Sequence, residues 1–161
     1  NFISTCFVVS NYIGESNKWD EKKKDYFYKE LLTKNDLLEW LRHGMFIGSH
    51  GKSHKSLLKL SEEQIKSEIY NSKNEIGDLF GINIDTFSYP FGQINRYSAK
   101  MVKELYNFGV TTVRSRFNTI KHKAYYIPRI HMSNNLSNFK IFLKLKTIYE
   151  DIKYDEKQLY M

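Results

Sequence analysis

The sequence predicts an α/β protein built around a parallel β-sheet. Strand-like and helix-like hydrophobic patterns alternate along most of its 161 residues, and this alternation is typical of parallel strands joined by right-handed helical crossovers. The length fits a single domain over residues 1–161, and a content of 41% hydrophobic and 16% aromatic residues excludes a disordered chain. An open α/β sheet and a β/α barrel both satisfy the pattern. In either fold the reactive groups gather at the carboxyl ends of the strands.

The amino-terminal part begins with a strand and continues with a polar segment. Residues 2–10 are rich in β-branched and aromatic side chains and almost continuously apolar, as expected of a strand covered on both faces. Residues 11–34 are polar and charged, and we expect the aromatic side chains of residues 26–28 to anchor a short helix there. The chain opens at Asn1 within strand-like sequence, which predicts an N-terminally truncated domain.

The next helix and strand lead directly to a histidine. Asp36 can cap a helix whose apolar residues share one face, and Gly44 supplies the left-handed residue that ends it. Residues 45–49 are short and apolar and fit a strand that places His50 at its carboxyl end.

Three helices and three strands are predicted from Ser61 onward. Ser61 and Gln64 form a capping box at the start of a helix whose apolar residues recur as far as Gly81. Further elements are a strand over 84–89 that Pro90 stops, a helix over 97–108 ended by Gly109, strands over 110–114 and 124–130, and a closing helix over 136–149.

Composition and charge restrict the possible partners. A single cysteine, Cys6, excludes an internal disulfide framework and a cysteine-rich zinc site. No apolar stretch approaches the roughly 20 residues of a membrane-spanning helix. The net charge of +7 favours an anionic partner, but acidic residues flank the lysine run at 22–24, which indicates a solvated loop. Charge and aromatic content leave nucleic-acid binding as a weaker alternative, and we expect no nucleic-acid partner.

His50 and His54 are the candidate metal ligands. They are four residues apart, so one helical turn would bring both imidazoles to the same side, where neutral nitrogens can share a divalent ion. A surface pair or a pair satisfied in the core is the alternative interpretation of this spacing. The position after a buried strand, among small residues such as Gly48, Ser49 and Gly51, favours the metal site.

Two motifs resemble a known family. Residues 46–54 (FIGSHGKSH), followed by 57–61 (LLKLS), resemble the second motif of the polysaccharide deacetylases, the NodB-homology group or carbohydrate esterase family four. Residues 87–92 (FSYPFG) are similar to that family's third motif, an aromatic turn containing proline and glycine. Residues 5–9 and 127–130 also resemble family segments, so that the likeness extends over nearly the whole chain.

The resemblance implies a distorted β/α barrel that removes N-acetyl groups from amino sugars of a cell-envelope polysaccharide or its precursor. By the family pattern, His50 and His54 hold a divalent metal, Zn²⁺ in the first place and Co²⁺ or Ni²⁺ as alternatives. The backbone N–H of Phe91 then helps to hold the oxyanion, while Tyr89, Pro90 and Phe91 line the substrate groove. His131 lies near the position of the family's late histidine, which serves as general acid.

One departure from the family pattern affects the expected activity. The family's first motif contains two adjacent aspartates that supply a third metal ligand and the general base, and no such pair occurs in this sequence. Asp20, Asp25 and Asp36 are expected in solvated or capping positions. Either an upstream segment supplies the aspartates, or the chain is a non-catalytic carbohydrate-binding derivative of the same fold. The compartment is open, with a bacterial cell envelope favoured, and the oligomeric state is not predicted.

Overall fold

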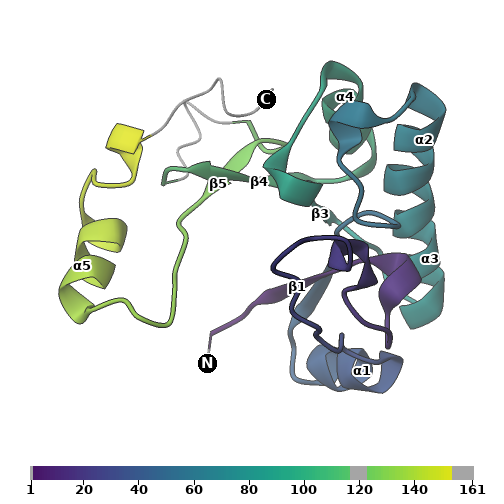
Figure 1. Ribbon diagram of the computed structural model, residues 1–161, viewed down its shortest axis with the longest axis horizontal. Coiled ribbons are helices and arrows are strands. Elements are labelled where there is room, and N and C mark those ends of the chain that lie inside the picture. Colours follow the sequence, from purple (N-terminus) through teal and green to yellow (C-terminus); the bar gives the residue numbers. More distant parts are fainter. Residues whose placement is uncertain (1, 117–122, 154–161) are drawn as a thin grey trace.

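The computed structural model describes residues 2–116 and 123–153. In this part of the chain, parallel strands form one five-stranded sheet whose order follows the sequence (Figure 1). When strands follow in sequence order, right-handed crossovers place every connection on the same face, as in a segment of a β/α barrel. The predicted α/β class is therefore confirmed, and the architecture agrees with an incomplete distorted barrel. The strands are β1 (Thr5–Val8), β2 (Phe46–Ser49), β3 (Thr86–Ser88), β4 (Phe108–Arg114) and β5 (Ile127–Arg129).

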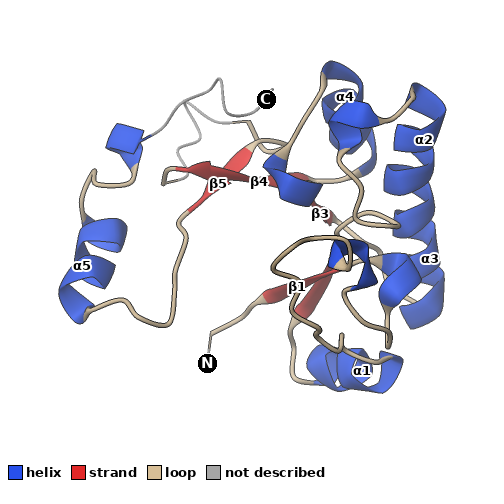
Figure 2. Ribbon diagram, viewed as in Figure 1, coloured by secondary structure: helices blue, strands red, loops and turns tan. Residues whose placement is uncertain are grey.

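Helices connect β1 to β2, β2 to β3 and β3 to β4 (Figure 2). The second crossover is one continuous rod in which α2, a π-helical turn (Ser67–Asn71) and α3 follow one another. Helix α5 lies apart from the other helices, beyond β5 (Figure 1). None of the described helices is both long enough and apolar enough to span a membrane. The helices are α1 (Lys34–Arg42), α2 (Glu62–Lys66), α3 (Ser72–Phe80), α4 (Arg96–Leu105) and α5 (Asn138–Lys146).

Capping interactions fix the helix starts. The predicted box of Ser61 and Gln64 is confirmed, because each side chain bonds the backbone N–H of the other residue, at 3.3 and 3.0 Å. The predicted cap at Asp36 is wrong by three residues. Thr33 is the N-cap of α1, and Asp36 is its reciprocal partner, whose carboxylate accepts from the Thr33 N–H at 2.8 Å. Asp36 belongs to a capping box, in which the acidic residue follows the cap by three positions.

The polar segment after β1 lacks the predicted helix at residues 26–28. It contains short 3₁₀ turns at Ser10–Tyr12 and Lys18–Asp20, and an antiparallel bridge joins Ser16 to Glu30. Phe27 is 72% exposed, so it does not anchor this segment to the core. The aromatic cluster was too short to define a helix face that could be buried.

Helix α4 ends three residues earlier than predicted, and Phe108 and Gly109 belong to β4. Phe108 was predicted to face the core, but its side chain is about half exposed in β4. A Cβ at Gly109 would lie 2.7 Å from the carbonyl oxygen of Tyr125. Gly109 is therefore required for the close approach of the chain before β5, where its N–H donates to the Ala124 carbonyl at 2.9 Å.

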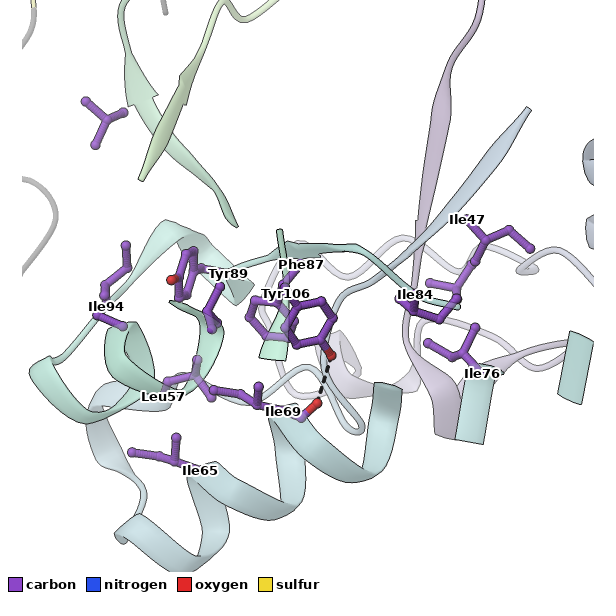
Figure 3. Packing of buried hydrophobic residues seen from close by; sticks show 14 of the residues in the cluster. Ile47, Leu57, Ile65, Ile69, Ile76, Ile84, Phe87, Tyr89, Ile94 and Tyr106 are labelled. Carbon is purple, nitrogen blue, oxygen red and sulfur yellow. Dashed lines mark hydrogen bonds between the residues drawn. The ribbon is translucent and has the colours of Figure 1, made fainter. Parts of the chain in front are cut away.

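The core lies between the sheet and the helices of the second and third crossovers (Figure 3). Phe87 of β3 packs on Tyr106, with 5.2 Å between ring centroids. The Tyr106 hydroxyl donates to the Ile69 carbonyl of the π turn at 2.8 Å. These contacts fix the rod against the sheet, and the rod in turn borders the loop that follows β2. Other fully or almost fully buried members are Ile47, Leu57, Ile65, Ile76, Ile84, Ile94 and Val102.

Candidate functional site

The loop after β2 brings the two predicted histidines together. The ring centroids of His50 and His54 lie 4.8 Å apart, with an angle of 65° between the planes. The predicted helical turn is wrong, because residues 50–54 form an irregular loop. Gly51, with φ of +81°, and His54, with φ of +56°, adopt left-handed conformations that reverse the chain. The two imidazoles therefore lie side by side as predicted, but a loop and not a helical turn brings them together.

A backbone carbonyl orients the ring of His50. Its Nδ1 lies 2.6 Å from the carbonyl oxygen of Ser88, at the carboxyl end of β3. A nitrogen at this distance from a carbonyl carries the proton, so that Nε2 keeps its lone pair. Burial lowers the pKa of His50, the bond to Ser88 raises it, and the charge of Arg129 lowers it. A neutral imidazole with Nε2 available is the form that binds a metal ion.

His54 lies between two aromatic rings. Its ring centroid is 4.7 Å from that of Trp19 and 4.8 Å from that of Phe91. Burial lowers the pKa of His54 to about 4, and the charge of His50 also lowers it, whereas that of Asp20 raises it. The Nδ1 atom of His54 is buried without a hydrogen-bond partner. A buried orphan nitrogen beside a second neutral imidazole fits a site for a cation.

Asp20 does not occupy the fully solvated position that the sequence suggested. Its side chain is about one-quarter exposed, at 26%, and its carboxylate pairs with Lys23. Lys23 also lies over the ring of Phe91, with its Nζ 5.4 Å from the centroid. The segment after β1 therefore folds over the histidine pair, which makes this polar segment part of the site. Within residues 2–116 and 123–153, however, no third His, Cys, Asp or Glu joins the pair as a ligand group.

The turn after β3 carries the second predicted motif. Phe91 has φ of +59°, and the N–H of Gly92 donates to the Tyr89 carbonyl at 2.9 Å. His54 and Phe91 are the two non-glycine residues with positive φ in the described part of the chain, and their rings are neighbours. Unfavourable backbone conformations persist where surrounding contacts enforce them, and they concentrate at functional sites.

The three residues predicted to line the substrate groove differ in their placement. The ring of Phe91 is 44% exposed beside His54. Tyr89 is fully buried, packs on Phe87 and donates from its hydroxyl to the Tyr125 carbonyl at 3.1 Å. Its side chain therefore belongs to the core, which corrects its predicted place in the groove. Because side chains two residues apart point to the same side of an extended strand, Tyr89 follows the inward direction of Phe87. Pro90 is also buried.

His131 is exposed on the segment that follows β5. Together with Thr112 and Arg129 it lines a hollow of about 230 Å³. The hydroxyl of Thr112 donates to the Phe91 carbonyl at 3.3 Å, so this hollow borders the Phe91 turn. The role of His131 as general acid stays a prediction.

Two functional candidates were absent from the sequence prediction. Trp19 stacks on His54, and Glu68 of the π turn bonds to the loop between the two histidines. A signal for Glu68 was present, because it follows Ile65 by three residues and precedes Ile69, which places a carboxylate on the apolar face of a helix. Trp19 gave no such signal, since its segment has no regular periodicity.

Comparison with known sequences identifies relatives of this chain. Residues 1–113 match the family model described as polysaccharide deacetylase. YxkH of Bacillus subtilis (strain 168), a protein named for the polysaccharide deacetylases, is 33% identical over 110 residues, which cover 68% of this chain and 35% of that protein. The poly-beta-1,6-N-acetyl-D-glucosamine N-deacetylase of Staphylococcus aureus (strain MSSA476) is 24% identical over 144 residues, 82% of this chain and 46% of that protein.

A solved structure shares the fold. The deacetylase PplD of Streptococcus pyogenes, solved in complex with acetate, matches with a TM-score of 0.74 and 21% identity over 89% of this chain and 59% of that chain. The chain spans between about a third and a half of the length of the curated relatives given above. Because the family model covers well over half of the 161 residues, and the two motifs lie side by side in the fold, the chain belongs to the polysaccharide deacetylase family.

Proposed function

We propose that this chain forms part of a metal-dependent hydrolase that removes N-acetyl groups from the amino sugars of a cell-envelope polysaccharide or its precursor. Membership of the family supports the reaction class. The similarity to a protein named for poly-beta-1,6-N-acetyl-D-glucosamine supports the substrate class. The observation that carries the proposal is the pair of neutral imidazoles, His50 and His54, beside the Phe91 turn.

His50 and His54 would hold a divalent ion, with Zn²⁺ expected first and Co²⁺ or Ni²⁺ as alternatives. Such an ion polarises an acetyl carbonyl and lowers the pKa of a bound water. The Ser88 carbonyl keeps the proton of His50 on Nδ1, and the rings of Trp19 and Phe91 hold His54 in place. These contacts set the orientation of both candidate ligands before substrate binds.

The Phe91 turn would act on the substrate itself. Its backbone N–H would donate to the oxyanion that forms when water attacks the acetyl carbon. The exposed Phe91 ring offers an apolar face for the sugar. His131, near the same turn, would donate the proton that the leaving amine requires.

A second function is a non-catalytic carbohydrate-binding protein of the same fold. It is favoured by one observation: in the part of the chain that the structure describes, no carboxylate completes a three-ligand site with the histidine pair. Hydrolysis also requires a base for the attacking water. Acetate release is therefore expected only from a form that carries these carboxylates.

Metal binding tests the first proposal. We expect calorimetry and the visible absorption of Co²⁺ to show that the wild type binds the metal. The affinity of the double variant H50A/H54A should be at least about 100-fold lower, because both ligands are removed. His43→Ala is the matched control, since His43 lies on the exposed end of α1 and bonds Glu39 instead. Equal affinity of the double variant and the wild type would contradict the proposed site.

Acetate release separates the two functions. N-acetylglucosamine oligomers are incubated with a Zn²⁺-loaded form that carries the missing carboxylates, and released acetate and oligomer binding are measured together. Acetate release that H50A abolishes supports the deacetylase. Binding of the oligomers without acetate release supports the carbohydrate-binding protein.

A further inference from the structure

The loop between the two histidines is held by a buried carboxylate from another element. Glu68, in the π turn between α2 and α3, is only 6% exposed. Its Oε2 accepts the backbone N–H groups of Lys52 and Ser53, each at 2.9 Å. Its Oε1 accepts the hydroxyl of Ser53. Three donors from consecutive loop residues therefore converge on one side chain.

These donors take the place of a cationic partner. A buried carboxylate is costly unless hydrogen bonds or an opposite charge compensate for its lost hydration. The ion pairs of the described residues do not include Glu68, and the ammonium group of Lys52 pairs with Glu75 instead. The charge of Glu68 is thus stabilised by this loop conformation. By the same interaction, Glu68 stabilises the loop.

The π turn supplies a second connection to the loop. The Gly51 N–H donates to the Ser49 hydroxyl at 3.2 Å, and the Ser49 and Ser72 hydroxyl oxygens lie 2.8 Å apart. Ser72 in turn donates to the Glu68 carbonyl at 2.6 Å. This continuous chain of hydrogen bonds runs from the loop to the backbone of the residue that binds it. π turns leave carbonyls without their ordinary helical partners, and they recur at functional sites.

The fit between Glu68 and the loop is close. A Cβ at Gly51 would lie 3.2 Å from Glu68 Oε2, and the φ of +81° at Gly51 also favours glycine. Any larger residue at this position would push the carboxylate away from the N–H groups that it binds. The loop between His50 and His54 is therefore shaped around Glu68.

We propose that Glu68 is a positioning residue, which holds residues 51–53 in the conformation that turns the rings of His50 and His54 toward each other. In this role it acts through the loop that it bonds, by way of Lys52 and Ser53. The expected effect of Glu68 on metal affinity rests on the proposed function. The expected effect of Glu68 on the loop conformation does not. The proposal assigns the π turn a role in building the site.

Glu68→Gln tests the proposal with little change in volume. Its amide can accept at only one atom, so the donors of Lys52 and Ser53 lose their shared carboxylate. We expect the hydrogen-exchange protection of these two amides, measured by NMR, to fall by about tenfold or more, because hydrogen bonds to charged groups are the stronger ones. Co²⁺ affinity should fall by about 10- to 100-fold, as for other residues that orient metal ligands.

Glu75→Gln is the matched control. Glu75 lies on the same rod and bonds the side chains of Lys52 and Ser10, but not the loop backbone. Its substitution should leave the protection of the two amides and the Co²⁺ affinity near wild-type values. If Glu68→Gln does not fold, Ser53→Ala removes one of the three donors, and we expect a smaller loss of Co²⁺ affinity in the same direction.

The possible results separate the two proposals. If the wild type binds no Co²⁺, the proposed metal site fails, but amide exchange still tests the role of Glu68. The role of Glu68 is overturned if a folded Glu68→Gln protein keeps wild-type protection at Lys52 and Ser53. It is also overturned if protection falls equally throughout the core, because that result indicates global destabilisation.

Discussion

Backbone conformation at a few positions sets the geometry of the site. His54 and Phe91 adopt a left-handed conformation that costs most side chains on the order of 1 kcal/mol. Each is fixed by aromatic packing, and Phe91 is followed by Gly92, which also has a positive φ of +69°. The turn therefore requires two successive residues with positive φ. Gly92 is the second of these two residues, and it also lies against β4.

Gly92→Ala tests the close approach of the turn to β4. The new Cβ would lie 1.9 Å from the Thr112 hydroxyl oxygen and 2.7 Å from the Thr112 nitrogen, so we expect a loss of about 2–4 kcal/mol in unfolding free energy. Gly81→Ala is the control, because Gly81 has a similar φ of +67° but no atom within 4 Å of the new Cβ. It should cost about 1 kcal/mol. Equal losses in urea denaturation would show that backbone strain accounts for both.

The histidine pair makes stability depend on pH. Burial lowers the pKa of His54 to about 4, below the ordinary value of 6.5, so between these values the unfolded state binds a proton that the folded state does not. The contribution of His54 to stability should be constant well above pH 6.5 and decrease as the pH falls through 6.5 toward 4, by at most about 1.4 kcal/mol per pH unit for one proton. His50 acts in the same direction.

Urea denaturation of the EDTA-treated protein between pH 4 and 7.5 measures this slope. His54→Gln removes the titrating group and should reduce the slope in this interval. His43→Ala, at the exposed end of α1, should retain it. A wild-type protein whose stability is flat from pH 7 to pH 4.5 would contradict the neutral, buried state of the pair.

Among the elements, the rod of α2, the π turn and α3 connects the core to the site. Its apolar residues face the sheet, and its π turn presents Glu68 to the histidine loop. Tyr106, which follows α4, anchors the same turn through the bond from its hydroxyl to the Ile69 carbonyl (Figure 3). Burial raises the pKa of Tyr106 to about 12, so this hydroxyl remains a donor at neutral pH.

Tyr106→Phe tests that anchor. The substitution leaves the aromatic packing on Phe87 but removes the donor to Ile69, and a loss of about 1–2 kcal/mol in unfolding free energy is expected. Tyr70→Phe, in the same π turn but 42% exposed, should change stability by less than about 0.5 kcal/mol. Equal effects of the two substitutions would show that the Tyr106 hydroxyl does not stabilise the turn.

Across the molecule, the C-terminal segment is joined to the sheet by charged side chains. Glu150 is fully buried, and its carboxylate accepts from Arg114 of β4 at 3.0 Å and from Lys144 of α5 at 2.6 Å. Next to Glu150 in the sequence, Asp151 accepts hydrogen bonds from the guanidinium group of Arg116, and these bonds lower the pKa of Asp151 to about 2. Many side chains of α5 are exposed, and within the described residues this ion-pair cluster joins α5 to β4.

Glu150→Gln should loosen this attachment. Removing one member of a buried charge cluster leaves Lys144 without its counter-charge, which costs on the order of 2–4 kcal/mol. We expect limited proteolysis to cleave the α5 region faster while the rod remains protected. Glu104→Gln, whose partner Lys100 lies 3.9 Å away on the exposed face of α4, is the control and should have no effect. Unchanged cleavage in Glu150→Gln would assign the attachment to apolar contacts.

Much of the fold follows from local patterns. The alternation of strands and helices, the box of Ser61 and Gln64 and the stop at Gly44 depend on neighbours within about four residues, so the sequence predicted them. Residues 26–28 and Phe108 were assigned wrongly because short apolar clusters fit several local structures. Contacts from other elements decide between those structures.

The motifs with His50, His54 and Phe91 could be predicted because each motif is a short run of residues directly after a strand, and because the two histidines are only four residues apart. The inward turn of Tyr89, the stacking of Trp19 and the bonds of Glu68 were not fixed by local sequence. Each depends on a partner between 15 and 36 residues away. Residues so far apart meet only when the sheet and its crossovers have packed, and that packing determines which side chains are buried and which loop a carboxylate can reach.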